Sequence, residues 1–184
     1  MKHILGIVGS PRKNGNTHVL LSAVLDAARA GGAETDLLFL ADLRIDECDG
    51  CHACWKTGRC AKRDDMSPLY DRIAASDGLV FGTPVYWYGP TGLMKTFIDR
   101  FVYFNCVETR GKIRGKSAAL VIPFEEENPE TADLTVQFFE KSFEYLELKL
   151  TQTLRVPGVT QRGEVAARAA DMAAAREMGA RLAS

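Results

Sequence analysis

The sequence predicts a doubly wound α/β domain, in which helices cover both faces of a parallel sheet. Short apolar runs rich in β-branched residues alternate with helix-like segments along the 184 residues, the order that produces βαβ units. The chain is 46% hydrophobic, which suits one sizeable core. No linker, internal repeat or low-complexity segment interrupts it. We therefore expect one domain over residues 1–184, with a cysteine-rich loop at residues 48–60.

Five segments are expected to be strands, at residues 3–9, 35–40, 78–82, 117–124 and 148–156. The first, HILGIVG, is a continuous apolar run, which is typical of a strand buried on both faces. GLVFG and SAALVIPF have the same character. Because helix-like segments separate these runs, we expect the strands to lie parallel in one sheet.

The helices are expected between the strands. The first covers Thr17–Ala30, with Thr17 as its N-cap and the pair Gly31–Gly32 at its end. A second begins at Ser67–Pro68 and runs to about Ala75, because proline suits a first helical turn. Three further helices are expected over residues 91–104, 129–146 and 163–183.

Charge and hydropathy exclude several classes of partner. The formal net charge is −1, so no basic surplus favours nucleic acid or an anionic membrane. The first apolar run is too short for a signal-peptide core, and no later run is long enough to span a bilayer. We expect a soluble cytoplasmic protein. The chain has five cysteines, an odd number, and a reducing cytosol rarely holds structural disulfides.

The loop after the first strand, GSPRKNGNT, has the composition of a phosphate site. In a doubly wound sheet, ligands bind beyond the carboxyl ends of the strands at the topological switch point. The loop offers hydroxyl, amide and cationic side chains and leads directly into a helix N-terminus. Neither the Walker spacing nor the dinucleotide fingerprint is present. A terminal monophosphate, as in FMN, remains; the alternative is a polar connecting loop.

The loop after the third strand places three aromatics in a row, Tyr86, Trp87 and Tyr88, between Pro84 and Pro90. Aromatic side chains at a loop tip are unfavourable in water, and stacking against a flat ring covers them. The alternative is burial against a neighbouring helix or a partner subunit. Both interpretations hold together if the ring lies at a dimer interface.

Four cysteines fall within thirteen residues, in the stretch CDGCHACWKTGRC. Cys48, Cys51, Cys54 and Cys60 have spacings of two, two and five residues. Zinc sites usually pair two C-x-x-C units across a longer gap, whereas consecutive two-residue spacings are typical of ferredoxin cluster loops. A [4Fe–4S] cluster, a zinc ion and reactive thiols without metal remain open alternatives.

Four stretches together resemble the NAD(P)H-dependent FMN reductases of flavodoxin-like fold, over nearly the whole chain. They are GSPRKNGNT, the cysteine stretch leading into AKRDDM, GTPVYWYGPTGLMKTFIDRF, and VPGVTQRGEV. The cysteine-bearing branch of that family includes the iron–sulfur flavoproteins. The resemblance implies a three-layer fold with a five-stranded parallel sheet of order 2-1-3-4-5, non-covalently bound FMN, and a homodimer or tetramer.

The resemblance also implies roles for individual residues. The phosphate would be held by Ser10, Arg12, Asn16 and Thr17, and the flavin ring would be lined by Pro84, Val85, Tyr86 and Trp87. A [4Fe–4S] cluster would be ligated by Cys48, Cys51, Cys54 and Cys60. One stretch departs from the family: where relatives often have a glycine-rich turn beside the flavin, this chain has Glu125–Glu127. These carboxylates would repel a nicotinamide phosphate if they face the ring, and would be solvated if they face water.

The function expected from these features is that of an FMN-dependent NAD(P)H oxidoreductase. Electrons would pass from a reduced donor to a small acceptor such as a quinone, with no side chain required as general acid, base or nucleophile. A first alternative is an iron–sulfur flavoprotein that relays electrons from a ferredoxin-like donor through the cluster to FMN. A second is a redox-sensing module in which FMN is structural and the cysteines respond to oxidants.

Overall fold

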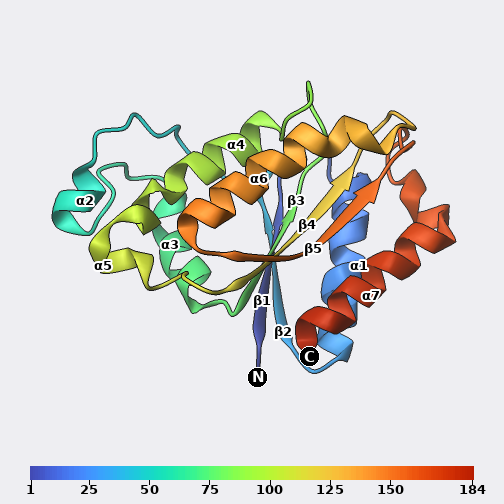
Figure 1. The fold of residues 1–184 in the computed structure, drawn as a ribbon, viewed down its shortest axis with the longest axis horizontal. Helices are drawn as coiled ribbons and strands as arrows, with labels where there is room; N and C mark the ends of the chain where they lie inside the picture. The colour runs from blue at the N-terminus through green and yellow to red at the C-terminus, as the bar shows by residue number, and fades with distance from the viewer.

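The computed structural model describes all residues, 1–184, and forms one five-stranded parallel sheet (Figure 1). Its spatial order is β2-β1-β3-β4-β5, which confirms the expected fold class and strand order. The strands are β1 (His3–Val8), β2 (Glu34–Phe39), β3 (Gly78–Gly82), β4 (Ser117–Pro123) and β5 (Lys149–Val156). All four strand pairs are parallel.

Helices cover both faces of the sheet, as Figure 1 shows. One face carries α1 (Asn16–Ala30) and α7 (Ala169–Ala183), and the other carries α3 (Met66–Ala75), α4 (Gly92–Asp99) and α6 (Asp133–Leu146). Two short helices, α2 (Ala53–Thr57) and α5 (Val107–Arg110), lie at the end of the molecule where the cysteine loop is found. No helix is long and apolar enough to cross a bilayer.

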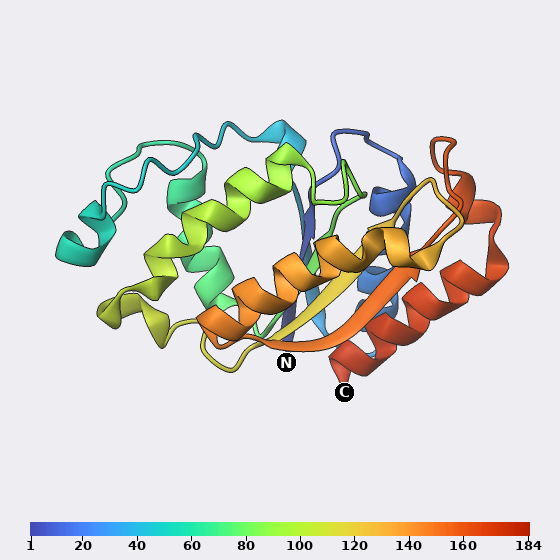
Figure 2. The ribbon, with the colours of Figure 1, turned by 45° about the horizontal axis from the view of Figure 1, so that its top comes forward.

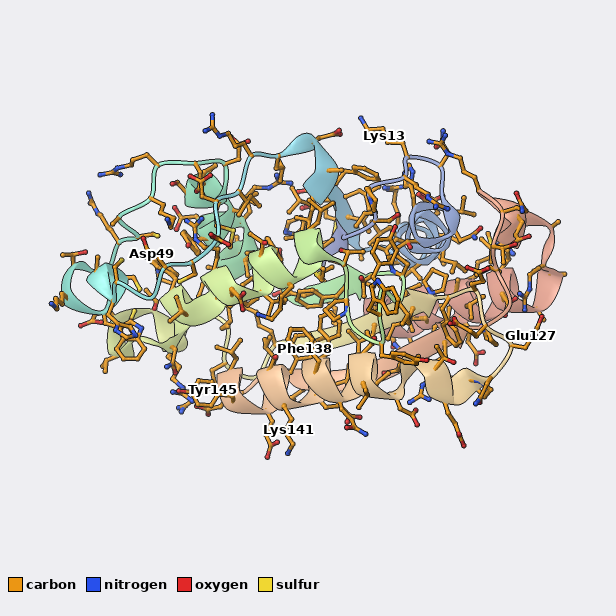
Figure 3. All side chains as sticks on the ribbon, turned by 90° about the horizontal axis from the view of Figure 1, so that it is seen from above. Lys13, Asp49, Glu127, Phe138, Lys141 and Tyr145 are labelled. Atoms are coloured by element: carbon orange, nitrogen blue, oxygen red, sulfur yellow. The ribbon has the colours of Figure 1, made fainter.

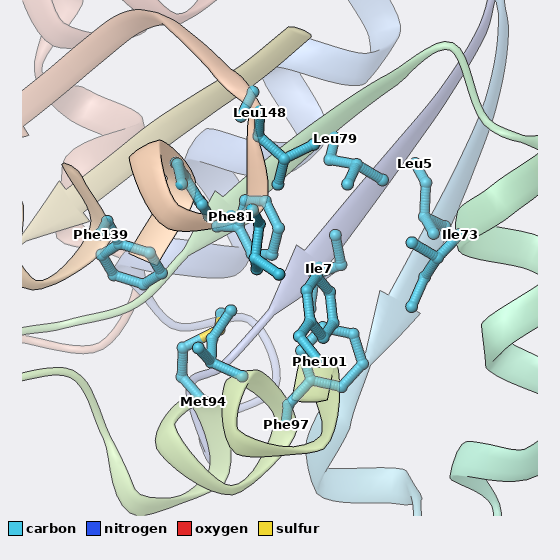
Figure 4. Packing of buried hydrophobic residues seen from close by; sticks show 14 of the residues in the cluster. Leu5, Ile7, Ile73, Leu79, Phe81, Met94, Phe97, Phe101, Phe139 and Leu148 are labelled. Atoms are coloured by element: carbon cyan, nitrogen blue, oxygen red, sulfur yellow. The ribbon is translucent and has the colours of Figure 1, made fainter. Parts of the chain in front are cut away.

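The side chains of alternate residues in the central strands pack into two separate hydrophobic cores, one on each face of the sheet. In β3, Leu79 and Phe81 point into the core under α3, α4 and α6, whereas Val80 points into the core under α1 and α7. Phe81 is fully buried, and its ring centroid lies 6.3 Å from that of Phe101 and 5.9 Å from that of Phe139 (Figure 4). This two-sided burial explains why the strand sequences are continuously apolar.

The pair α1 and α7 packs closely because of one glycine. A Cβ atom built on Gly179 would lie 2.0 Å from the carbonyl oxygen of Val24, a distance no side chain tolerates. The two helices therefore meet backbone to backbone at this point, and their close packing fixes the position of α1. The N-terminus of α1 opens at the carboxyl edge of the sheet.

Three expected helix boundaries were wrong. Helix α1 begins at Asn16 with Gly15 as its extended N-cap, so Thr17 lies inside the first turn and is not the cap. The helix expected to reach residue 104 ends at Asp99 and continues as a 3-10 segment, Arg100–Asn105. The last helix begins only at Ala169, because Arg168 is extended and donates a hydrogen bond to Pro157 O at 2.6 Å.

Candidate functional site

The loops that follow β1 and β3 are fastened to each other at their bases. The Gly9 N–H donates to Gly82 O at 2.7 Å. The Thr91 hydroxyl donates to Gly9 O, and the Thr91 N–H donates to the Thr83 hydroxyl at 3.1 Å. The two loops that the sequence singled out thus leave neighbouring strands side by side, at the switch point where a doubly wound sheet binds its ligand.

A hollow of about 130 Å³ opens between these loops. Seven of the eight residues predicted for the flavin line it: Ser10, Arg12, Asn16, Thr17, Pro84, Val85 and Tyr86. The loops after β4 and β5 complete the wall with Glu125, which the sequence left either near the ring or in water, and with residues that were not predicted, namely Pro123, Phe124, Val159, Thr160 and Arg162; Gly15 adds backbone. Four strand ends therefore contribute to a single site.

The floor of this hollow is suited to an anion. The N–H groups of Asn16, Thr17 and His18 form no hydrogen bond within the chain, because the N-cap Gly15 has no side chain to accept one. They carry the positive end of a 15-residue helix. The Ser10 hydroxyl, which accepts the Arg12 N–H at 3.2 Å, and the buried Thr17 side chain lie beside them.

The Asn16 side chain makes hydrogen bonds within the protein, whereas the resemblance implies that it binds the phosphate directly. Its side-chain Nδ2 donates to Gln161 O at 3.0 Å, and its Oδ1 accepts the Val165 N–H at 3.2 Å. The side chain thus fastens the first loop to the segment after β5. Its backbone N–H remains free in the hollow.

Two guanidinium groups border the hollow without a carboxylate partner in the chain. Arg12 comes from the first loop, and Arg162 reaches it from the loop after β5, with Nε donating to Lys13 O at 2.8 Å. Lys13 is instead paired with Asp42, 2.7 Å away. Arg162 was not predicted as a site residue, because the residues that it contacts in the first loop lie 149 positions away in the sequence. No local sequence pattern indicates a contact between segments so far apart.

The aromatic loop forms a tight turn with unusual backbone. Tyr86 and Gly89 exchange two backbone hydrogen bonds, of 2.8 and 3.1 Å. The residues between them, Trp87 and Tyr88, both have positive φ, +50° and +63°, as a type I′ turn requires. Tyr86 lines the hollow, whereas Trp87 is 98% exposed and lies outside it. The Thr135 hydroxyl holds the turn through Tyr88 O at 3.0 Å.

The glutamate side chains of the acidic loop after β4 do not all face the hollow. Glu125 lines the hollow, so one negative charge faces the site. Glu127 lies instead against the neighbouring loop, since a Cβ on Gly158 would come within 2.7 Å of its Oε1. Gly158 has a φ of +68°, and its N–H donates to Glu126 O at 3.0 Å. This pairing holds the loops after β4 and β5 together.

The four clustered cysteines line a second, smaller hollow of about 20 Å³. All are free thiols, and no group of three or more His, Cys, Asp or Glu side chains stands in a metal-binding arrangement. Burial, followed by the neighbouring Cys106 and Cys60, raises the pKa of the Cys54 thiol. The residue types fit a thiolate-ligated group in their chemistry, since all four cysteines line one hollow; the ligand role of Cys48, Cys51, Cys54 and Cys60 stays a prediction.

The two hollows lie far apart along the molecule. In Figure 2 the cysteine loop and α2 occupy one end, whereas the loop after β1 lies past the middle of the molecule, on the side of α7. Figure 3 shows the same separation from above, with Asp49 of the cysteine loop at one end and Lys13 and Glu127 toward the other. One chain therefore does not bring its cysteines beside its own anion-binding hollow.

Comparison with known proteins agrees with the sequence motifs. The chain is 35% identical over 120 residues to an iron-sulfur flavoprotein of Archaeoglobus fulgidus, an alignment that covers 65% of this chain and 53% of that protein. It is 37% identical over 97 residues to an iron-sulfur flavoprotein of Methanocaldococcus jannaschii, covering 53% and 50% of the two chains. The chain thus spans about half the length of these curated relatives.

Solved structures with the same fold include an NAD(P)H:quinone oxidoreductase from Methanothermobacter marburgensis. Its TM-score is 0.79 at 17% identity, over 99% of this chain and 96% of that one. The Trp repressor binding protein from Bacillus subtilis has a TM-score of 0.72 at 22% identity, over 95% and 98% of the chains. The family model described as NADPH-dependent FMN reductase matches residues 2–135. Since that match spans well over half of the sequence, this chain belongs to the NADPH-dependent FMN reductase family.

Proposed function

We propose that this protein is an FMN-dependent oxidoreductase that passes electrons from a reduced donor to a small acceptor. The observation that carries the proposal is the anion-binding floor of the larger hollow. Asn16 and Thr17, whose N–H groups at the start of α1 have no partner in the chain, line it, and two guanidinium groups without carboxylate partners border it. A phosphate monoester satisfies both kinds of group at once.

The residues that line the hollow fix the direction in which the ligand would lie. The phosphate would lie against Ser10, Thr17 and the first turn of α1, and the ring would lie toward Pro84, Val85 and Tyr86. These ring-side residues supply apolar surface and backbone amides. When bound, FMN supplies the redox chemistry, and the protein contributes binding and orientation. No side chain is required to transfer a proton, which agrees with the lack of a paired acid and base in the hollow.

We propose NAD(P)H as the reduced donor. Glu125 faces the hollow, and the site offers no further cation beyond Arg12 and Arg162, which the FMN phosphate would occupy. A second phosphate, the 2′-phosphate of NADPH, would therefore meet a negative charge without a partner. We expect NADH to be used at least as well as NADPH.

The second candidate function is that of an electron carrier with a cysteine-held cluster. It is favoured by the four cysteines around one hollow and by the names of the relatives. A ferredoxin-like protein would then be the donor. In Figure 3, Asp49 of the cysteine loop and Lys13 of the loop after β1 lie apart from each other, which favours the first function over a relay within one chain. Exposed apolar side chains along the α4–α6 side, among them Trp55, Leu134 and Tyr145, support the expectation of a homodimer or tetramer.

Steady-state turnover tests the proposal. Protein purified without oxygen and loaded with FMN should oxidise NADH, and NADPH no faster, with a benzoquinone as acceptor. Replacement of all four clustered cysteines by serine should leave this turnover unchanged. Absence of turnover with either nucleotide, together with reduction of the bound flavin by a reduced ferredoxin, would replace the first function by the second. Absence of both, with thiol oxidation altering partner binding, would favour the redox sensor.

A further inference from the structure

Among the buried side-chain nitrogen and oxygen atoms, one has no hydrogen-bond partner, the hydroxyl of Tyr70. The side chain of Tyr70 is 5% exposed, so water does not reach the hydroxyl freely. An unpaired buried hydroxyl is unfavourable, because it has given up its hydrogen bonds to water without replacing them. Burial raises the pKa of Tyr70, and the Arg100 guanidinium and the Cys60 thiol lie close enough to affect it as well, although neither makes a hydrogen bond of good geometry with the hydroxyl. A group bound in an adjoining hollow would supply the missing partner.

The ring of Tyr70 is held so that its hydroxyl cannot turn away. It stacks on Tyr103 with ring centroids 4.0 Å apart and an interplanar angle of 26°. Phe104 contacts it edge-on, with centroids 5.8 Å apart. Tyr70 comes from α3, on the main body of the fold, and it lines the hollow of the four cysteines. Tyr70 also borders a larger hollow of about 400 Å³ together with Cys60 and Arg63. Because the hydroxyl itself is buried from solvent, the missing partner is to be sought in the smaller hollow of the four cysteines.

A second donor lines the same hollow. Arg100 is the largest fully buried side chain in the protein, at 1% exposure. Its guanidinium pairs with the buried carboxylate of Asp64 and donates through Nη1 to Asp46 O at 2.8 Å. Its Nη2 also points at Cys60, 3.3 Å from Sγ. A neutral thiol is a weak acceptor, whereas a thiolate bound to metal accepts a strong, charge-assisted hydrogen bond.

We propose that Tyr70 and Arg100 are positioning residues that donate hydrogen bonds to an anionic, thiolate-ligated metal centre held by Cys48, Cys51, Cys54 and Cys60. Both side chains carry hydrogen-bond donors and line the hollow, and both are fixed by packing or by an ion pair before any metal arrives. Donors to ligand sulfur tune the potential and the affinity of such centres. The proposal rests on the predicted cysteine ligands and is independent of the proposed flavin chemistry.

The test compares Tyr70→Phe with wild type in the full chain, purified without oxygen. Tyr145→Phe serves as control, because Tyr145 is exposed and does not line the hollow. One arm supplies iron and sulfide, and the other supplies zinc alone. FMN content is measured on the same samples, so that loss of the metal centre and loss of flavin binding are distinguished.

Without metal, Tyr70→Phe should be at least as stable as wild type, because it removes an unsatisfied hydroxyl and keeps the stacked ring. With iron and sulfide, its midpoint potential should fall, since the more negative reduced centre loses a donor. A tenfold weaker preference for the reduced form corresponds to about 59 mV for one electron. If zinc is the metal that binds, its affinity should fall about tenfold or more. Tyr145→Phe should match wild type throughout.

Three results would overturn the proposal. One is a Tyr70→Phe variant with wild-type potential and wild-type metal affinity. Another is a wild-type chain that takes up neither iron with sulfide nor zinc. The third is a Tyr70→Phe variant that is clearly less stable than wild type without metal, because the hydroxyl would then have a partner in the chain itself.

Discussion

The side-chain oxygen of Asn16 accepts a hydrogen bond of 3.2 Å from the backbone N–H of Val165, 149 positions away in the chain. The amide nitrogen of the same side chain donates to Gln161 O at 3.0 Å. Together these bonds hold the loop after β5, with Arg162, against the first turn of α1. The anion-binding hollow therefore depends on a contact between the two ends of the sequence.

Asn16→Ala should weaken FMN binding by about tenfold or more, because Arg162 loses the support that places it at the hollow. Two hydrogen bonds, each with a net value of about 0.5–1.5 kcal/mol, are removed. Fluorescence titration of FMN measures the effect. Gln161→Ala is the matched control, since only the backbone carbonyl of that residue is used. If both variants bind FMN equally, the Asn16 side chain does not organise the site.

Gly179→Ala should destabilise the fold, because its new Cβ would lie 2.0 Å from Val24 O in α1. The helices must separate, and overpacking of this kind costs about 1–3 kcal/mol. Urea unfolding measures the change. Gly111→Ala provides the control, since that glycine has helical backbone and no atom within 4 Å of its Cβ position. A loss no larger than that of Gly111→Ala would contradict the close packing of α1 and α7.

The Asp64 carboxyl should make the free energy of unfolding depend on pH. Burial raises the pKa of this carboxyl, but hydrogen bonds from Arg100 and the Asp46 N–H outweigh it, and the pKa lies below its ordinary 3.8. Because the folded pKa is the lower one, the contribution of Asp64 is complete above the unfolded pKa. It is lost as the pH falls through the folded pKa. Thermal unfolding followed from pH 7 down to about pH 2 should show this acid loss.

Asp64→Asn should remove that part of the pH dependence and lower stability by about 3–5 kcal/mol at neutral pH, since Arg100 would stay buried without its counter-charge. Asp99→Asn is the control, because Asp99 pairs with Lys95 on the surface at 2.6 Å, and such pairs contribute about 0–1 kcal/mol. Equal losses in the two variants would show that the Arg100–Asp64 pair is not a buried one.

Replacing Trp87 by a residue that adopts positive φ more readily should stabilise the turn and therefore the folded protein. Trp87 is 98% exposed at a φ of +50°, so the folded chain gains little from its side chain and bears the left-handed backbone cost, about 1–2 kcal/mol. Trp87→Asn should therefore raise the melting temperature of the flavin-free protein. A lower melting temperature would mean that the indole is covered, for instance by a second copy of the chain.

The strands and the loop positions could be predicted from sequence because their signals are local. A continuous apolar run such as residues 78–82 needs only its own residues to indicate a doubly buried strand. A polar loop leading into a helix at residues 9–17 is recognised in the same way. The aromatic turn was located correctly, but its type I′ geometry was not foreseen, because neither Asn nor Gly occupies the two central positions.

The rest of both sites depends on distant contacts. Arg162 joins the phosphate loop, Arg100 reaches the cysteine hollow, and Tyr70 faces it from another helix. Each is an unremarkable residue in its own segment. The N-cap of α1 shows the same limit at short range. Threonine and glycine are about equally favoured as N-caps, so preference does not distinguish Thr17 from Gly15, and Gly15, which takes the position, leaves the first-turn N–H groups open to a ligand.

The central claim is that the hollow at the start of α1 binds the phosphate of FMN. The most direct measurement is calorimetric titration of the flavin-free chain with FMN and, separately, with riboflavin, which lacks the phosphate. We expect FMN to bind one per chain and about 100-fold more tightly than riboflavin, a difference of about 2.7 kcal/mol. Equal affinities for the two compounds, or no binding of FMN, would contradict the account.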